Sequence, residues 1–395
     1  MKLFDVYPLY DVTPVSAKGI IVTDDKGQEY LDFYGGHAVI SIGHSHPHYV
    51  KRLKDQLDNI GFYSNAVKNP LQVELAEKLG RLSDCDDYNL FLCSSGAEAN
   101  ENALKMASFH TGKSRVIAFN NSFHGRTSAA VAATDNPKIN APINRQQKVT
   151  FLPFDDAGGL EDEISKGDVC AIILEAGQGV GGLDQPSTEF YQTVERLCQQ
   201  HQVALIADEV QSGFGRTGKF FGFQHHDISP AIISIAKGMG NGFPVGGVLI
   251  HKSIEASYGL LGTTFGGNHL ACAATLAVLE VLEKERLMEN AVHLEKHFRK
   301  LAADVPGLKR VKGRGLMLGL EFPFEVANLR KRLIHNQHLF TGGAKDKHVL
   351  RILPALNINE AHLDRFFKAL HDELAIETIN TNDTEIAYGA NDTNK

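Results

Sequence analysis

Features that would assign this 395-residue chain to several protein classes are absent or scarce. No apolar stretch approaches the roughly 18 residues of a membrane-spanning helix, and the opening MKLFDVYPLYD lacks the order of a signal peptide, so we expect no membrane association. The five cysteines are scattered without a CxxC pair, which predicts buried free thiols and a cytoplasmic protein. Lys and Arg (40) are fewer than Asp and Glu (47), which argues against nucleic acid as a partner.

The residues that are present suit an ordinary globular protein. Hydrophobic residues make up 43% and charged residues 22%, which is enough apolar material for a sizeable core. At roughly 150 residues per domain, the length favours two or three domains. Short β-branched apolar runs alternate with helical stretches, which is typical of an α/β protein with a mostly parallel sheet.

These runs predict the individual elements and a division into domains. Helices are expected at Ala97–His110 and Thr188–His201, and from about Asn268 towards Glu285. We predict a large domain over 51–267 and a smaller α/β domain over 268–375, which the N-terminal segment 1–50 joins. A closing helix is expected near Glu360–Leu374, followed by a disordered tail over 376–395. Buried strands are expected at Tyr88–Cys93, Arg115–Phe119, Lys148–Leu152, Val169–Glu175, Val203–Asp208, Ile232–Ala236 and Val245–Ile250.

Four residues with potential chemistry lie at the ends of predicted parallel strands: Ser95, Glu175, Asp208 and Lys237. Ligands of open α/β sheets bind at the carboxyl ends of strands, so several such residues at one edge indicate a site. The segment SSGAE at 94–98 precedes a helix. Its small residues would let backbone N–H groups approach a phosphate, although the same segment also fits an ordinary N-cap.

The pair Asp208 and Lys237 is the strongest single indication of an active site. Desolvation in a crevice lowers the pKa of a lysine and makes it a usable amine nucleophile. A carboxylate nearby can keep a pyridinium nitrogen protonated. Together with a phosphate-binding site at Ser95–Ala97, the pair indicates a pocket for pyridoxal phosphate. The simpler interpretation is that Asp208 and Lys237 form a structural ion pair.

Three other patterns suggest different chemistry. GQGVGG at 177–182 matches the dinucleotide-binding pattern, but Pro186 and a polar run separate it from the next helix, so a nicotinamide-dependent dehydrogenase is the weaker alternative. GFGRTGK at 213–219 resembles a P-loop, yet Phe220 stands where a magnesium-binding Ser or Thr is needed. His44, His46 and His48 could bind a metal, but no ligand cluster accompanies them, so we expect a turn entering a helix and no metal site.

At this level of detail the chain resembles the class III pyridoxal-phosphate aminotransferases, and within them the acetylornithine branch. The resemblance implies fold type I, a homodimer with a shared active site, and transfer of the terminal amine of N-acetylornithine to 2-oxoglutarate in arginine biosynthesis. The motifs that carry it include SSGAEANENALKMA, FHGRT, LEAGQGVGG, ADEVQSGFGRTGKFF, AKGMGNGFPVG, TTFGGNHLACAA and RILPALNI.

The resemblance also implies roles for particular residues. Lys237 would form the Schiff base and move protons, and Asp208 would pair with the ring nitrogen. Arg126 would receive the carboxylate of the acylated donor and Arg351 the α-carboxylate of glutamate, since guanidinium forks bind carboxylates in pairs of hydrogen bonds. The other implied cofactor contacts are Ser95, Gly96, Ala97, Phe123, Glu209, Val210, Gln211 and, across the dimer, Thr264; the other implied substrate contacts are Thr263, Glu175 and His37.

Three positions depart from the family pattern. Many relatives have Glu where this chain has Val180, and that Glu can cover the glutamate-binding arginine. His37 replaces a common Ile or Tyr, and His269 replaces a common Pro. These changes leave open N-succinylornithine, ornithine or 4-aminobutyrate as the amino donor.

Overall fold

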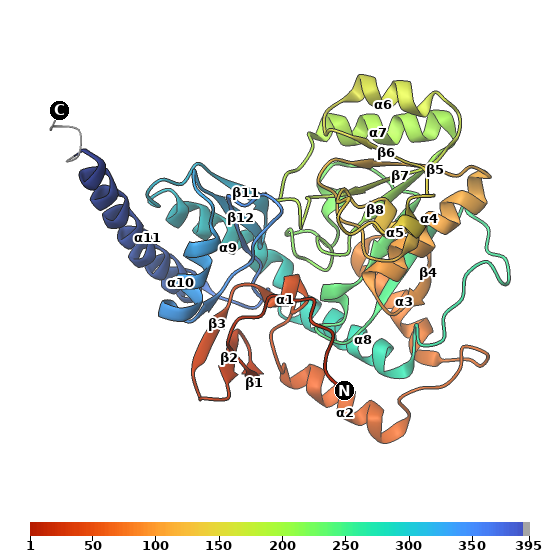
Figure 1. The fold of residues 1–395 in the computed structure, drawn as a ribbon. Coiled ribbons are helices and arrows are strands. Elements are labelled where there is room, and N and C mark those ends of the chain that lie inside the picture. The colour runs from red at the N-terminus through yellow and green to blue at the C-terminus, as the bar shows by residue number, and fades with distance from the viewer. Residues whose placement is uncertain (390–395) are drawn as a thin grey trace.

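The computed structural model describes the backbone of residues 1–389 and the side chains of residues 1–375. Its elements form a larger and a smaller α/β unit, with the smaller one made from both ends of the chain (Figure 1). Among the described residues, no helix is long and apolar enough to cross a membrane.

A seven-stranded sheet forms the centre of the larger unit. Its strand order is β4-β10-β9-β8-β7-β5-β6, and all pairs among the last five are parallel. Because β10 is antiparallel to both β9 and β4, β4 runs in the same direction as the parallel strands. The strands are β4 (Tyr88–Cys93), β5 (Arg115–Phe119), β6 (Val149–Leu152), β7 (Val169–Glu175), β8 (Ala204–Asp208), β9 (Ile232–Ile235) and β10 (Gly246–His251).

The predicted strands are confirmed within one residue at each end. The central strands β5, β7, β8 and β9 are buried on both faces, as expected of continuous apolar runs, whereas β4 and the edge strand β6 are partly exposed. In β7, Ile172 and Leu174 face one core cluster, while Ala171 and Ile173 face a second one that also holds buried residues of α4. Helices therefore cover both faces of the sheet. They are α3 (Pro70–Ser83), α4 (Gly96–Thr111), α5 (Ser128–Ala132), α6 (Ala157–Ile164) and α7 (Thr188–His201), with short 3-10 turns at Pro142–Asn144, Gly222–His225 and Lys237–Met239.

The smaller unit contains two sheets. In the first, β1 (Pro14–Lys18), β2 (Ile21–Asp24) and β3 (Glu29–Asp32) are joined by β13 (Leu339–Phe340), which pairs in parallel with β3. The N-terminal strands therefore lie beside the C-terminal part of the chain. The second sheet has the order β11-β12-β14, from Arg310–Arg314, Met317–Glu321 and Val349–Ile352.

The remaining helices connect and flank these sheets. They are the short irregular α1 (Gly35–Ala38), α2 (Pro47–Asn59), α8 (His269–Lys284), α9 (Leu287–Ala302), α10 (Ala327–Gln337) and α11 (Glu360–Gly389). Helix α11 continues past the expected end near Leu374, to Gly389, and residues 390–395 lie outside the described residues. The disordered tail stays a prediction. The domain boundaries at 50 and 267 stay predictions.

Candidate active site

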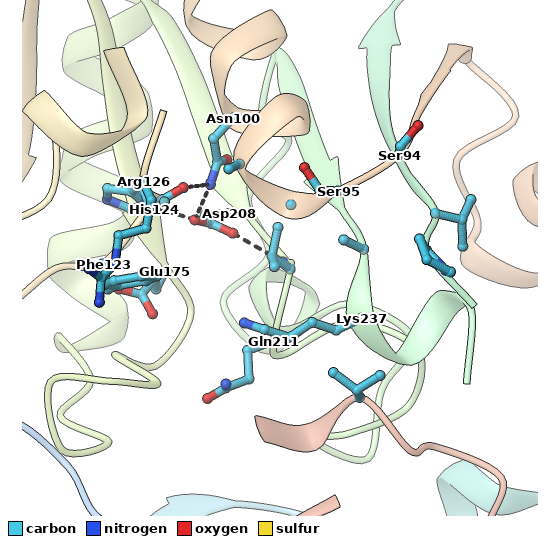
Figure 2. A pocket seen from close by; sticks show the side chains of 18 of the residues that line it. Ser94, Ser95, Asn100, Phe123, His124, Arg126, Glu175, Asp208, Gln211 and Lys237 are labelled. Atoms are coloured by element: carbon cyan, nitrogen blue, oxygen red, sulfur yellow. Dashed lines mark hydrogen bonds and ion pairs between the residues drawn. The ribbon is translucent and has the colours of Figure 1, made fainter. Parts of the chain in front are cut away.

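The carboxyl ends of β4, β7, β8 and β9 meet at one edge of the large sheet. Glu175 and Asp208 are register partners at the ends of β7 and β8, and Asp208 is the partner of Ser234, three residues before Lys237. A cavity of about 350 Å³ lies at this edge (Figure 2). The predicted site residues that line it are Ser95, Gly96, Ala97, Phe123, Arg126, Glu175, Asp208, Val210, Gln211 and Lys237.

The amino end of α4 forms one wall of this cavity. Ser95 is the N-cap: its hydroxyl accepts a hydrogen bond from the Glu98 N–H at 3.2 Å. The N–H groups of Gly96 and Ala97 belong to the first turn, where the helix itself supplies no acceptor. A Cβ on Gly96 would come within 2.7 Å of Val210 Cγ1, so glycine is required there. The segment therefore serves as an N-cap and also presents two N–H groups that can bind an anion.

Asp208 is held from two sides at the base of the cavity. Its Oδ2 accepts a hydrogen bond from Asn100 Nδ2 at 2.7 Å and lies 2.7 Å from Nδ1 of the buried His124 (Figure 2). The other oxygen, Oδ1, accepts from the Val210 N–H at 3.0 Å. These contacts fix the direction of the carboxylate.

Lys237 follows β9 in a left-handed backbone conformation, with φ of 49°. Burial is the main cause that lowers the pKa of its ammonium group; Arg351 lowers it as well, whereas Asp208 and Glu175 raise it. The shift increases the fraction of neutral amine, which is the nucleophilic form. Figure 2 shows the side chain beside Gln211, within the cavity.

Phe123 and Arg126 also line the cavity. The Arg126 guanidinium lies 5.9 Å from the centre of the Phe123 ring, and Arg126 is exposed to solvent. An exposed arginine that also lines the cavity can receive an anionic group of an entering molecule.

Glu175 lines the cavity but is bound to the backbone. Its Oε1 accepts from the Phe123 N–H at 3.0 Å, and its Oε2 accepts from the Gly179 N–H at 2.8 Å. Burial raises the pKa of this carboxyl to about 7. Each oxygen binds one amide and can accept a further hydrogen bond, so a direct contact between Glu175 and substrate stays a prediction.

Arg351 lies beyond the cavity lining, on β14, and is 3% exposed. Its Nη1 donates to the Gly179 carbonyl at 2.5 Å and its Nε to the Gly343 carbonyl at 2.6 Å. Among the described residues, no carboxylate lies within 4 Å of this guanidinium. A buried cation without a carboxylate is a good site for an anionic ligand.

His37 is near both this arginine and the cavity residue Gln211. The Tyr34 hydroxyl lies 2.5 and 2.8 Å from its two ring nitrogens, and Gln211 Nε2 donates to the His37 carbonyl at 3.2 Å. Burial, together with Arg351 and Lys237, lowers the pKa of His37 to about 4. The imidazole is therefore neutral at pH 7.

Five predicted residues do not line the cavity: Arg351 and His37, described above, and Glu209, Thr263 and Thr264. Glu209 faces away from it, because its carboxylate accepts from Ser212 and from the amides of Gly222 and Phe223; the prediction that it contacts the cofactor does not fit this geometry. Thr263 accepts from the Gly266 N–H and lines a separate cavity, and Thr264 is exposed.

Among the lining residues that sequence reasoning missed are the two whose side chains hold Asp208, Asn100 and His124. Both had a signal. Asn100 is four residues after Gly96, so it lies on the same face of α4. His124 directly follows Phe123 in the FHGRT motif.

The alternative motifs have other roles. No helix follows the glycines at 177–182 before α7 begins at Thr188, so they do not form a dinucleotide site. No α-helix follows the 213–219 segment before the strand β9 either. His44, His46 and His48 contact Asp32, Glu285 and Glu280, and α2 begins at Pro47 as expected. Within the described part of the chain, no group of three or more His, Cys, Asp or Glu side chains could hold a metal ion.

The cavity fits pyridoxal phosphate. The α4 amino end can hold the phosphate, Asp208 the ring nitrogen and Lys237 the carbonyl carbon. Gln211 Oε1 is buried and has no hydrogen-bond partner among the described residues, so it can accept from a ring hydroxyl. The amine, the carboxylate and the anion seat are thus arranged around one space.

Comparisons with known proteins agree with this geometry. The family model for class III aminotransferases matches residues 6–374. The acetylornithine aminotransferase of Bacillus subtilis is 39% identical over 95% of this chain and 98% of its own length; that of Methanocaldococcus jannaschii is 37% identical over 94% and 95%. The ornithine aminotransferase structure from Toxoplasma gondii has a TM-score of 0.87 at 27% identity, covering 94% of this chain and 92% of the other. An S-selective transaminase from Arthrobacter sp. shares the fold, with a TM-score of 0.86 at 23% identity over 95% of both chains.

Proposed function

Because this chain belongs to the class III aminotransferases, which are pyridoxal-phosphate enzymes, we propose that it transfers the terminal amine of N-acetylornithine to 2-oxoglutarate. The products are N-acetylglutamate semialdehyde and glutamate, and the reaction is a step of arginine biosynthesis. The observation that carries the proposal is the cavity where Lys237, Asp208 and the amino end of α4 meet. The choice of donor is supported by the names of the relatives at 36–39% identity.

Different residues of this chain have different roles in the proposed reaction. Lys237 Nζ would hold the cofactor and, once the donor amine has taken its place, its free amine would accept the proton from the amine-bearing carbon of the donor. The Asp208 carboxylate holds a proton on the ring nitrogen, and Asn100 and His124 keep that carboxylate in place. Pyridoxal phosphate, when bound, supplies the electron sink for the charge left on that carbon.

The two arginines suit the two carboxylate-bearing substrates. Arg126, exposed at the cavity wall, receives the carboxylate of the acylated donor. Arg351, without a carboxylate partner in the described structure, receives the α-carboxylate of glutamate or 2-oxoglutarate. Both half-reactions then use the same lysine.

We place a second copy of the chain beside the site. Thr264 and Phe265 lie in an exposed loop away from the cavity, and Phe265 is 62% exposed. Phe62, 44% exposed, packs against Phe265, so the loop presents an apolar patch. A homodimer would cover this patch and bring Thr264 to the phosphate of the partner. The five cysteines, all free and buried, suit a cytoplasmic location.

A panel of amino donors with 2-oxoglutarate tests the proposal. Purified protein with pyridoxal phosphate is given N-acetylornithine, N-succinylornithine, ornithine or 4-aminobutyrate, and glutamate formation is measured. We expect a higher kcat/KM with N-acetylornithine than with ornithine or 4-aminobutyrate, and a loss of several orders of magnitude in kcat in Lys237→Ala. Higher kcat/KM with free ornithine or 4-aminobutyrate would replace the proposed donor and keep the reaction type.

A further inference from the structure

Glu175 joins two parts of the site that lie on different elements. One carboxylate oxygen binds the amide of Phe123, which lines the cavity, and the other binds the amide of Gly179. The carbonyl of the same Gly179 accepts the hydrogen bond from Arg351 Nη1. A single side chain thus connects a cavity wall, through one peptide unit, to the buried guanidinium 172 residues away from Gly179.

Little space is left for this connection to adjust. A Cβ on Gly179 would come within 2.0 Å of Gln211 Oε1, so the glycine backbone lies directly against a cavity side chain. The neighbouring Val180 carbonyl accepts from the Lys345 N–H at 2.8 Å, which ties this loop to the segment before β14. The Tyr191 hydroxyl donates to the carbonyls of Glu175 and Ala176 and fixes the strand end.

We propose that Glu175 is a positioning residue that sets the place of Arg351, and of Phe123, and thereby the affinity for the dicarboxylate substrate. The inference rests on the proposed role of Arg351 as the carboxylate-binding arginine. Two amides require two acceptor oxygens, and only an ionised carboxylate offers both without a proton on either. A neutral carboxyl or an amide side chain supports one amide well and leaves the other poorly bound.

If Glu175 positions Arg351, the affinity for a dicarboxylate should depend on the protonation of Glu175. A side chain that served packing alone would give no such pH dependence. Burial raises its pKa to about 7, while His124 lowers it and Asp208 raises it. Lys237, Arg351 and Tyr191 also interact with Glu175. His37 does not titrate in the same range, because its pKa is lowered to about 4. Below pH 7 the Glu175 carboxyl gains a proton, so the affinity of the site for a dicarboxylate should decrease as the pH is lowered.

The test uses glutarate, an unreactive five-carbon dicarboxylate, which binds without turnover. Calorimetric titration of the native holoenzyme between pH 6 and 8 should give a Kd that rises about tenfold as the pH falls through about 7. Glu175→Gln should weaken glutarate by about tenfold or more at pH 8 and remove this pH dependence. It should also release the cofactor faster on dialysis, because the Phe123 amide loses support.

The matched control is Glu373→Gln. Glu373 is also fully buried, but it is held by Arg332, Asn336 and Gln337 between α10 and α11, far from the cavity. This variant should bind glutarate like the native protein even if it melts at a lower temperature. Equal weakening in both variants, or a flat pH profile in the native protein, would overturn the proposal. Because glutarate needs no amino donor, this result is independent of whether N-acetylornithine is the substrate.

Discussion

The residue at position 180 should decide how the site treats a second negative charge. Arg351 donates to the carbonyl of Gly179, directly before Val180, and no carboxylate of the described residues lies within 4 Å of it. His37 is neutral at pH 7, because its pKa is about 4, so it adds a hydrogen-bonding group and no charge. Val180→Glu would therefore introduce an anion directly after the carbonyl that Arg351 binds.

The size of the effect follows from Coulomb's law. Two unit charges about 5 Å apart interact by about 1 to 3 kcal/mol between the dielectric of water and an effective value near 20. This energy corresponds to about a 5- to 150-fold change in an affinity or in kcat/KM. N-succinylornithine carries one carboxylate more than N-acetylornithine, so the new anion should act selectively against it.

The assay compares kcat/KM for the two acylated donors in three proteins. We expect native protein to use N-succinylornithine at least comparably to N-acetylornithine. Val180→Glu should lower the succinyl-to-acetyl ratio by about 5- to 150-fold. In Val180→Gln the new side chain has nearly the size of Glu but no charge, so this variant should keep a succinyl-to-acetyl ratio close to that of native protein. The KM for 2-oxoglutarate should rise in the Glu variant only, since the new carboxylate competes for Arg351.

Two results would refute this reasoning. Equal ratios in the Glu and Gln variants would mean that size rather than charge controls the donor. If native protein does not use N-succinylornithine at all, plain N-acetylornithine specificity holds and Val180 serves packing.

Three further predictions concern the lysine, the oligomer and a buried carboxylate. Borohydride reduction and peptide mapping should find the cofactor on Lys237, and Lys237→Ala should lose several orders of magnitude in kcat; a label on another lysine contradicts the assignment. Sedimentation should give a dimer, and Thr264→Ala should retain the cofactor less well on dialysis; a fully active monomer would exclude the shared site. Burial raises the pKa of Glu209 from 4.5 to about 7, so the folded state loses stability as the pH rises through 7. Between pH 5 and 8, Glu209→Gln should therefore gain up to about 3 kcal/mol in unfolding free energy relative to native protein, and a constant difference in thermal unfolding would show that Glu209 does not titrate.

The sequence alone predicted the strands and the main chemical residues. A run such as VCAIILE has no polar side chain before its last residue, so it is stable only where both faces of a strand are covered. Because parallel strands end at the same edge, Asp208 after one run and Lys237 after another were expected to lie together. The family motifs then indicated the cofactor and the reaction.

Only the tertiary structure decided which neighbours of these residues serve the site. Asp208 and Glu209 are consecutive, and side chains of an extended chain alternate in direction, so one faces the cavity and the other the turn at Gly222. The contact between Gly179 and Arg351 depends on how the large sheet and β14 pack, which no local pattern encodes. Local propensity and strand order are properties of short segments, whereas the positions of Glu175, Gly179 and Arg351 relative to one another arise only when distant segments pack together.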